Sequence, residues 1–251
     1  MSTHPVNRLP KGGLLDRGST LRFRFDGVDY AGYAGDTLAS ALMANGVRLV
    51  GRSFKYHRPR GIFTAGSEEP NALVELRSGP AREPNTKATT VELYAGLEAH
   101  SQNRWPSLQW DLLSVNSALS AFLPAGFYYK TFMWPRSFWE KVYEPLIRRA
   151  AGLGRAAGHA DPDTYVQSWA FCDVLVIGSG PAGLSAALAA GRAGARVILC
   201  EEDFRLGGRL VSETFEVDGA PAHAWAETVA RELASLPNVR VMLRTSVLGS
   251  F

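Results

Sequence analysis

Apolar and polar residues alternate with a period of two near the start of the chain. Residues 21–25 read Leu-Arg-Phe-Arg-Phe, and residues 28–33 form a second short run, Val-Asp-Tyr-Ala-Gly-Tyr. Between them stands Asp26-Gly27, a pair that is strongly favoured in two-residue β-hairpin turns. The pattern therefore predicts an antiparallel hairpin, because a period of two matches the alternating faces of a strand.

A helix is predicted directly after this hairpin, over residues 37–45. Three apolar residues, Leu38, Ala41 and Leu42, fall on one of its faces. Asp36 is the predicted N-cap and Gly46 the predicted C-terminal stop.

A hairpin crossed by one helix is how a small β-grasp domain begins. Two later apolar runs, residues 72–76 and residues 89–94, are predicted to be further strands of the same domain. We therefore place a ferredoxin-like β-grasp domain over residues 19–95. The polar residues 1–18 are expected to be an arm without a core of its own.

Proline and large aromatic residues recur in residues 96–170. Helices are predicted at about residues 114–122 and 137–151, and the small, polar residues 152–162 are predicted to be a linker. The segment Gly126–Trp134 is too aromatic for a solvated loop. It either packs over the domains or anchors another subunit, since large aromatic residues dominate interface hot spots.

The pattern changes again after residue 170. Val174–Ile177 is a continuous apolar run with the length of a buried parallel strand, and an Ala- and Leu-rich helix is predicted over about residues 181–193. A second apolar strand, Val197–Cys200, ends at Glu201. This β-α-β unit of about thirty residues is the context that a dinucleotide fingerprint requires. We predict a Rossmann-type domain over residues 171–251.

The glycines of this unit follow the pattern Gly178-x-Gly180-x-x-Gly183. They permit, in order, a tight turn, the approach of a pyrophosphate to the helix N-terminus, and close packing of helix on strands. Glu201 follows 23 residues after Gly178, placed to accept hydrogen bonds from a ribose diol and to repel the 2′-phosphate of NADP. The predicted cofactor-binding residues are Gly178, Ser179, Gly180, Pro181, Ala182, Gly183, Glu201, Glu202, Asp203, Gly208, Arg209 and Val247.

The last members of this set come from the segment after Glu201. Gly207-Gly208 is typical of a loop that folds back over a nucleotide, and a helix over about residues 222–236 leads to a third strand over residues 239–244. The end of that strand would bring the backbone of Val247 to the adenine. Because a nucleotide-binding sheet normally has more than three strands, we expect this domain to be incomplete and the chain to be part of a longer protein.

Composition excludes several classes of protein. The 251 residues carry a net charge of +3, and 46% of them are hydrophobic, an ordinary globular balance. The sequence has neither a nucleic-acid-binding motif nor an apolar stretch long enough to span a membrane, and we expect a cytoplasmic protein. The two cysteines, Cys172 and Cys200, are expected to be buried and reduced, and no metal site is predicted.

Positive charge is concentrated in residues 48–60, which contain five Lys or Arg residues and no acidic residue. This basic strip is either a surface for a phosphate or a partner, which we favour, or a solvated loop. We assign residues 52–60 of this strip and Gly126–Trp134 to subunit contact and, by the resemblance described next, to the neighbourhood of a flavin. Arg58 and Arg60 would supply fixed positive charge.

Three of these features together resemble the alpha subunits of heterotetrameric sarcosine oxidases. They are the run Gly-Arg-Ser-Phe-Lys-Tyr-His-Arg-Pro-Arg-Gly over residues 51–61, the aromatic segment Gly126–Trp134, and the fingerprint. The resemblance covers about residues 8–251. It implies a complex of alpha, beta, gamma and delta subunits that demethylates sarcosine to glycine, with hydrogen peroxide and with formaldehyde or methylenetetrahydrofolate as products.

The resemblance also implies in which subunit each cofactor binds and where the amine is oxidised. NAD would lie on this chain, amine oxidation would occur at FAD in the beta subunit, and FMN would lie between alpha and beta. Sarcosine and tetrahydrofolate would bind elsewhere in the complex, so no catalytic residue is assigned to this chain.

Related amine and opine dehydrogenase subunits hold a [2Fe–2S] cluster in the same β-grasp domain through four cysteines. Comparison with them places Thr64, Glu69 and Ala72 at cysteine positions, and none of these is a thiolate ligand. The resemblance therefore implies a ferredoxin-like domain that lacks its cluster.

Two other functions remain open at this point. The fingerprint also fits FAD in a two-dinucleotide amine or opine dehydrogenase subunit, because both dinucleotides present a ribose diol. Alternatively, the chain is a non-catalytic scaffold whose nucleotide only stabilises assembly.

Overall fold

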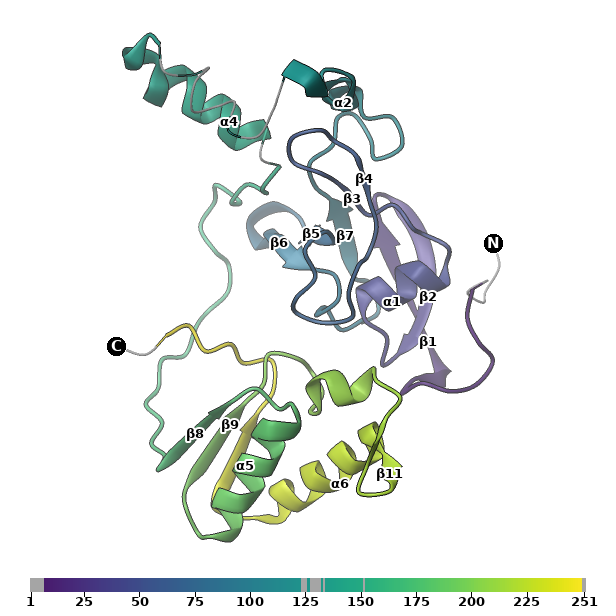
Figure 1. Cartoon of the computed structure of the whole chain (residues 1–251), viewed down its shortest axis with the longest axis vertical. Coiled ribbons are helices and arrows are strands. Elements are labelled where there is room, and N and C mark those ends of the chain that lie inside the picture. Colours follow the sequence, from purple (N-terminus) through teal and green to yellow (C-terminus); the bar gives the residue numbers. More distant parts are fainter. Residues whose placement is uncertain (1–6, 123–125, 127–131, 133, 151, 250–251) are drawn as a thin grey trace. The chain divides into compact units, whose positions relative to one another are not determined.

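The structure is a computed structural model that describes residues 7–122, 126, 132, 134–150 and 152–249. The chain divides into two compact units, residues 1–163 and residues 164–251 (Figure 1). The boundary lies several residues before the predicted one at 170, and each unit has its own hydrophobic core.

The predicted hairpin is present at the start of the first unit. β1 (Asp16–Phe25) pairs antiparallel with β2 (Val28–Ala34), and Phe25 faces Val28 across the turn. Asp26 and Gly27 have φ angles of 48° and 81°, as a type I′ turn requires. Because β1 begins at Asp16, the predicted arm over residues 1–18 extends too far.

The first unit contains a five-stranded sheet in the order β2-β1-β7-β5-β6 (Figure 1). β1 and β7 are parallel, and the other neighbouring pairs are antiparallel. A separate two-stranded ribbon joins β3 and β4. The remaining bounds are β3 (Gly51–Arg52), β4 (Pro59–Arg60), β5 (Leu73–Leu76), η1 (Gly79–Ala81), β6 (Glu83–Lys87) and β7 (Glu98–Ser101).

Two predictions about this sheet were wrong. Residues 89–94 form no strand, apart from an isolated bridge between Thr37 and Glu92. The sheet instead uses β6 and β7, and because β7 lies beyond residue 95, the predicted end of the domain was too early.

Helix α1 (Leu38–Ala44) packs its apolar face into the core of this sheet, as predicted. Its N-cap is Thr37 rather than Asp36, because Thr37 and Ser40 exchange hydrogen bonds in a capping box. Asp36 is fully buried and binds Arg8 through both carboxylate oxygens, at 2.7 Å each. Arg8 thus fixes part of the predicted arm to the domain.

In the segment after β7, the helices are shorter and less regular than predicted. The expected helix over 114–122 consists of short pieces, because Ser, Asn and Val are weak helix formers. The expected helix over 137–151 begins at residue 136 and includes a π-helical turn. Most of Gly126–Trp134 lies outside the described residues. The bounds are η2 (Leu112–Ser114), α2 (Val115–Ala118), η3 (Ser120–Phe122), η4 (Arg136–Phe138), η5 (Trp139–Tyr143) and α4 (Glu144–Ala150).

The second unit is built on the predicted β-α-β arrangement. Three parallel strands form a sheet in the order β12-β9-β8, and α5 and α6 pack on it (Figure 1). This order matches the first half of a Rossmann fold. The bounds are β8 (Val174–Ile177), α5 (Pro181–Arg192), β9 (Val197–Cys200), η6 (Gly208–Val211), β10 (Glu216–Val217), β11 (Ala220–Pro221), α6 (Ala222–Ser235) and β12 (Val239–Met242).

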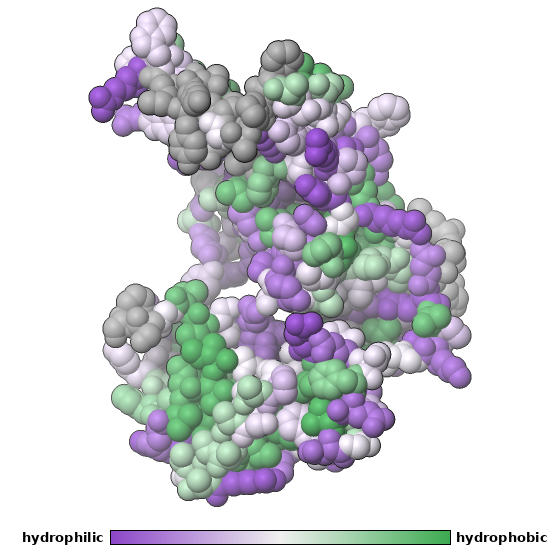
Figure 2. Space-filling model, viewed as in Figure 1, coloured by the Kyte–Doolittle hydropathy of each residue, from purple (hydrophilic) through white to green (hydrophobic). Residues whose placement is uncertain are grey.

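Strand β8 is less buried than its apolar sequence predicted. Val176 faces α5 and is buried, whereas Leu175 and Ile177 are exposed on the opposite face. Figure 2 shows apolar residues gathered on the surface of this unit over β8. The full burial expected of a parallel strand is met only by β9, all four residues of which are buried.

Both cysteines are free. Cys200 is buried at the end of β9, but Cys172 is partly exposed, so the expectation that both are buried was wrong for Cys172. Within the described part of the chain, each helix is too short or too polar to span a lipid bilayer.

Candidate dinucleotide-binding site

The turn from β8 to α5 places the three fingerprint glycines as the sequence predicts. Gly178 has a φ angle of +87°, which strains any residue with a side chain. A Cβ on Gly183 would lie 2.0 Å from the carbonyl oxygen of Gly178, so helix and turn touch here. A Cβ on Gly180 would meet nothing within 4 Å. Space is therefore open at the start of α5.

This open space adjoins the N-terminus of a twelve-residue helix. Gly180 is its N-cap, Pro181 occupies the first turn, and Ala182 follows. The first N–H groups of a helix have no acceptor within the helix, and the helix dipole adds partial positive charge there. The arrangement is suited to an anion such as a pyrophosphate.

Glu201 lies at the end of β9 and is buried beside the fingerprint turn. Its Oε2 accepts hydrogen bonds from the N–H and the hydroxyl of Ser179, at 2.7 and 2.5 Å. Its Oε1 accepts the N–H of Asp203 at 2.9 Å. A carboxylate offers about four acceptor positions, so these three bonds leave room for a ribose hydroxyl. The role of Glu201 as ribose acceptor stays a prediction.

Ser179 also connects the fingerprint to the second glycine loop. The N–H of Gly207 donates to the hydroxyl of Ser179 at 3.0 Å and to the backbone carbonyl of Ser179 at 3.2 Å. A Cβ on Gly208 would lie 3.2 Å from the Cα of Gly180. The structure thus brings residues 207–208 against residues 179–180, where a nucleotide is expected.

The other predicted residues lie around this centre with less direct contacts. Glu202 is exposed, and Arg209 is exposed and pairs with Glu213 at 2.8 Å. Asp203 is half-buried, and burial together with Glu201 and Glu202 raises its pKa above the usual value. Val247 is exposed in the segment after β12.

The segment after β12 is held by backbone hydrogen bonds that the sequence did not predict. Thr245 donates its N–H to the carbonyl of Glu201 at 2.8 Å, and Arg244 donates its N–H to the carbonyl of Asp203 at 3.0 Å. These bonds continue the pairing of β12 with β9 past the strand ends. Thr245 is two residues before Val247, so these bonds keep the chain beside the candidate site up to that point.

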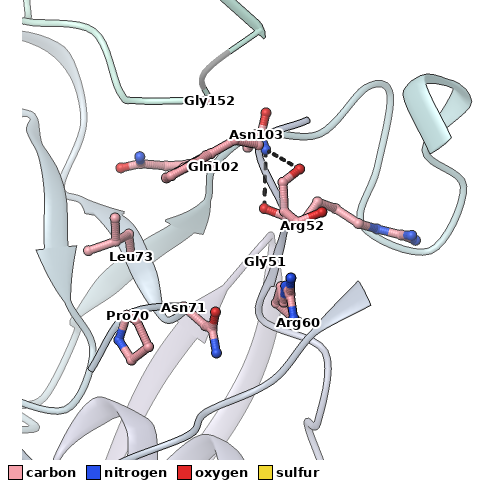
Figure 3. A pocket seen from close by; sticks show the side chains of 11 residues that line it. Gly51, Arg52, Arg60, Pro70, Asn71, Leu73, Gln102, Asn103 and Gly152 are labelled. Carbon is pink, nitrogen blue, oxygen red and sulfur yellow. Dashed lines mark hydrogen bonds between the residues drawn. The ribbon is translucent and has the colours of Figure 1, made fainter. Parts of the chain in front are cut away.

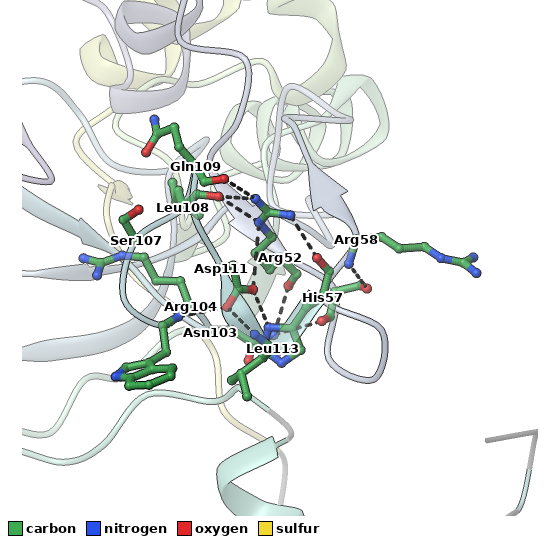
Figure 4. Close-up of polar contacts among 12 residues, drawn as sticks. Arg52, His57, Arg58, Asn103, Arg104, Ser107, Leu108, Gln109, Asp111 and Leu113 are labelled. Atoms are coloured by element: carbon green, nitrogen blue, oxygen red, sulfur yellow. Dashed lines mark hydrogen bonds and ion pairs between the residues drawn. The ribbon is translucent and has the colours of Figure 1, made fainter. Parts of the chain in front are cut away.

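The basic strip is organised around a buried carboxylate that sequence reasoning missed. Asp111 Oδ2 lies 2.6 Å from His57 Nδ1 and 4.0 Å from Arg52 Nε, and all three side chains are nearly inaccessible to solvent (Figure 4). Arg52 also donates its Nε–H to the carbonyl of Leu108 at 2.9 Å. Arg52 is therefore structural, whereas Arg58 and Arg60 remain exposed. His57 is buried together with Asp111.

A pocket of about 180 Å³ lies in the first unit, between the strip and neighbouring loops (Figure 3). Its lining includes Gly51, Arg60, Asn71 and Gln102. The side chain of Asn103 there donates to the carbonyl oxygens of Arg52 and Ser53, at 3.1 and 3.0 Å. None of the predicted cofactor-binding residues lines this pocket.

Two protein families match separate parts of the chain. Residues 18–104 match the 2Fe-2S iron-sulfur cluster binding domain family, and residues 173–245 match the FAD dependent oxidoreductase family. The first match does not extend to the cluster itself, because residues 18–104 contain no cysteine to ligate iron. The second match agrees with the Rossmann-type arrangement of the second unit.

The fold of the whole chain has a solved counterpart. The crystal structure of L-proline dehydrogenase from P. horikoshii matches 99% of this chain and 37% of its own, with a TM-score of 0.55 and 20% sequence identity. At that identity the match concerns the fold alone. It agrees with a ferredoxin-like domain followed by a Rossmann-type domain.

Curated relatives match at much higher identity. The sarcosine oxidase subunit alpha of Rhizobium meliloti (strain 1021) is 63% identical over 242 residues, which cover 96% of this chain and 24% of the relative. That of Corynebacterium sp. (strain P-1) is 36% identical over 259 residues, covering 100% of this chain and 22% of the relative. The chain thus spans about a quarter of the length of these relatives. The predicted resemblance is confirmed: over nearly its whole length, the chain is similar to the alpha subunits of sarcosine oxidases.

Proposed function

We propose that the second unit binds NAD, as part of the alpha subunit of a flavin-dependent sarcosine oxidase. The observation that carries this proposal is the open space at Gly180, at the N-terminus of α5, next to a buried carboxylate held by Ser179. An open helix N-terminus beside an acidic residue at the end of the second strand is the arrangement that receives a pyrophosphate and a ribose.

Different residues of the site bind different parts of the ligand. The N-terminus of α5 holds the pyrophosphate, and Gly180 allows its close approach. Glu201 accepts a hydrogen bond from the ribose diol, and its charge disfavours NADP. When bound, NAD supplies hydride-transfer chemistry. This chain contributes binding and orientation.

The reaction itself we assign to the assembled enzyme. By its likeness to sarcosine oxidase alpha subunits, the chain joins beta, gamma and delta subunits in the cytoplasm, and the complex demethylates sarcosine to glycine. FAD in the beta subunit oxidises the amine, FMN lies between alpha and beta, and tetrahydrofolate binds outside this chain. We assign no catalytic residue to the described part of the chain.

FAD at the same fingerprint is the second candidate. The match of residues 173–245 to the FAD dependent oxidoreductase family favours it. NAD and FAD would both use Gly180 and Glu201 in the same way. Loss of binding in a variant therefore does not distinguish them, whereas the affinity of the protein for each dinucleotide does.

Titration of the protein with NAD and with FAD tests the proposal. Gly180→Val should abolish NAD binding, because the side chain fills the open space. Glu201→Ala should weaken it by about tenfold or more, as expected for the loss of a charged hydrogen bond of about 1.5–3 kcal/mol. Glu227→Ala removes an exposed acid of α6 and should bind NAD as the wild type does. Unchanged affinity in both site variants would reject the assignment.

The partner surface is proposed to include the basic strip and Gly126–Trp134. Within that segment, the structure describes Trp134, whose side chain is 83% exposed. Trp134→Ala should weaken assembly with the other subunits and leave the melting temperature of the alpha subunit nearly unchanged. A loss of stability without a specific loss of assembly would contradict this role.

A further inference from the structure

Glu69 is a buried acidic residue whose side chain is only 2% exposed. Its Oε2 accepts hydrogen bonds from the N–H groups of Phe63 and Thr64, at 2.8 and 2.6 Å, and from the Thr64 hydroxyl at 3.2 Å. Its Oε1 accepts the N–H groups of Asn71 and Ala72, at 2.8 and 3.1 Å. One carboxylate therefore joins both ends of the loop over residues 63–72.

The middle of this loop is fixed to the domain by other contacts. The carbonyl of Gly66 accepts the Thr89 hydroxyl at 2.7 Å and the N–H of Glu69 at 3.2 Å. Lys87 at the end of β6 donates to the carbonyl of Ser67. The loop is thus closed around Glu69 on one side and attached to the sheet on the other.

The loop lies within residues 18–104, the part of the chain that matches the 2Fe-2S iron-sulfur cluster binding domain family. Thr64, Glu69 and Ala72 have the spacing of the first three ligands in the plant-type C-x4-C-x2-C pattern. In this structure, the side chain at the middle position binds the backbone at the other two. The backbone N–H groups of the two outer positions, Thr64 and Ala72, therefore bind the carboxylate at the middle position, Glu69.

A carboxylate is chemically able to take this place. The sulfur atoms of an iron–sulfur cluster carry negative charge and accept hydrogen bonds from the surrounding backbone. An ionised carboxylate also offers negative charge and several acceptor positions, and its bonds to backbone N–H groups are strong. Burial raises the pKa of Glu69, but its backbone hydrogen bonds outweigh that effect and hold the pKa below the usual value.

We propose that the Glu69 carboxylate replaces the [2Fe–2S] cluster as the anion around which this loop folds. The ferredoxin-like domain consequently keeps the loop of its iron-binding relatives without iron. Among the described residues, no group of three or more His, Cys, Asp or Glu side chains is placed to hold another metal ion. The loop of this domain therefore depends on a side chain instead of a cofactor.

Hydrogen exchange of the backbone amides in the complete protein tests this role. In the wild type, the amides of Phe63, Thr64, Asn71 and Ala72 should exchange slowly although they belong to a loop. Glu69→Gln keeps the size of the side chain but removes its charge and turns one acceptor into a donor. It should speed the exchange of these amides by about tenfold or more. Glu68→Gln removes the charge of the exposed neighbouring acid and should leave them unchanged.

Three results would overturn the proposal. The first is equal protection of the four amides in the wild type and in Glu69→Gln. The second is an equal loss of protection in Glu69→Gln and in the Glu68→Gln control. The third is iron and acid-labile sulfide in stoichiometric amount in the wild type. If Glu69→Gln does not fold, the wild type still decides, because amides that exchange as fast as an unstructured peptide would show that Glu69 does not hold the loop.

Discussion

The hydroxyl of Ser179 lies 2.5 Å from Oε2 of Glu201, and both side chains are buried. This contact joins the turn after β8 to the end of β9, the two places from which a dinucleotide would be held. Ser179 and Glu201 were both predicted as site residues. The structure adds that one positions the other.

Replacing Ser179 by Ala tests this relationship. The variant loses the hydroxyl that donates to Glu201 and accepts the N–H of Gly207. We expect the free energy of unfolding to fall by about 1–3 kcal/mol, because buried partners lose hydrogen bonds. Urea unfolding measures the change. Ser185→Ala, at an exposed position of α5, is the control and should not destabilise the protein.

A second prediction concerns acid stability of the second unit. Asp173 accepts hydrogen bonds from Arg196 through its backbone N–H at 2.8 Å and its guanidinium at 2.7 and 3.1 Å. The Arg196 side chain and backbone together lower the pKa of Asp173 from 3.8 to about 2. Because the folded pKa is below the unfolded value, the pair stabilises the fold above about pH 4, and this contribution is lost as the pH falls towards 2.

Asp173→Asn should therefore flatten the fall in melting temperature between about pH 4 and pH 2, relative to the wild type. Arg196→Gln should flatten it in the same way, since it removes the guanidinium half of the same interaction. An unchanged pH profile in both variants would show that the pair does not contribute. The effect is expected to be small because both side chains are exposed to solvent.

The buried group of Arg52, His57 and Asp111 gives a third prediction. Asp111 also accepts the N–H groups of Trp105 and Leu113, at 3.0 and 3.3 Å. Asp111→Ala should lower the free energy of unfolding by about 3–5 kcal/mol, because it leaves a buried guanidinium without its carboxylate. Asp29→Ala removes an exposed partner of Arg24 and should change stability little. Equal effects in a denaturant titration would contradict a structural role for Asp111.

Local signals predicted much of this fold. The hairpin at Asp26-Gly27, helix α1 and the β8-α5-β9 unit follow from turn residues, caps and apolar runs that lie close together in the sequence. The fingerprint glycines are recognisable for the same reason. Each occupies a position where backbone geometry or close packing restricts the residue type.

Long-range contacts decided the remaining features. Strand β7 reads Glu-Ala-His-Ser, which lacks the apolar alternation of a strand, yet it pairs with both β1 and β5. Asp36 resembles an N-cap in sequence, but Arg8 and the backbone of Tyr33 bind its carboxylate. The bonding of Glu69 and of Asp111 depends in the same way on partners that a sequence pattern does not reveal.

The most direct test of a dinucleotide site at Gly180 and Glu201 is the identity of the nucleotide that the protein carries. Complete protein, purified without added nucleotide, is denatured, and the released small molecules are separated and identified by mass. We expect NAD in about equal amount to the alpha subunit, and its loss in Gly180→Val. Release of FAD from this subunit in place of NAD would favour the second candidate, and release of neither dinucleotide, with no binding on titration, would contradict a dinucleotide site at Gly180 and Glu201.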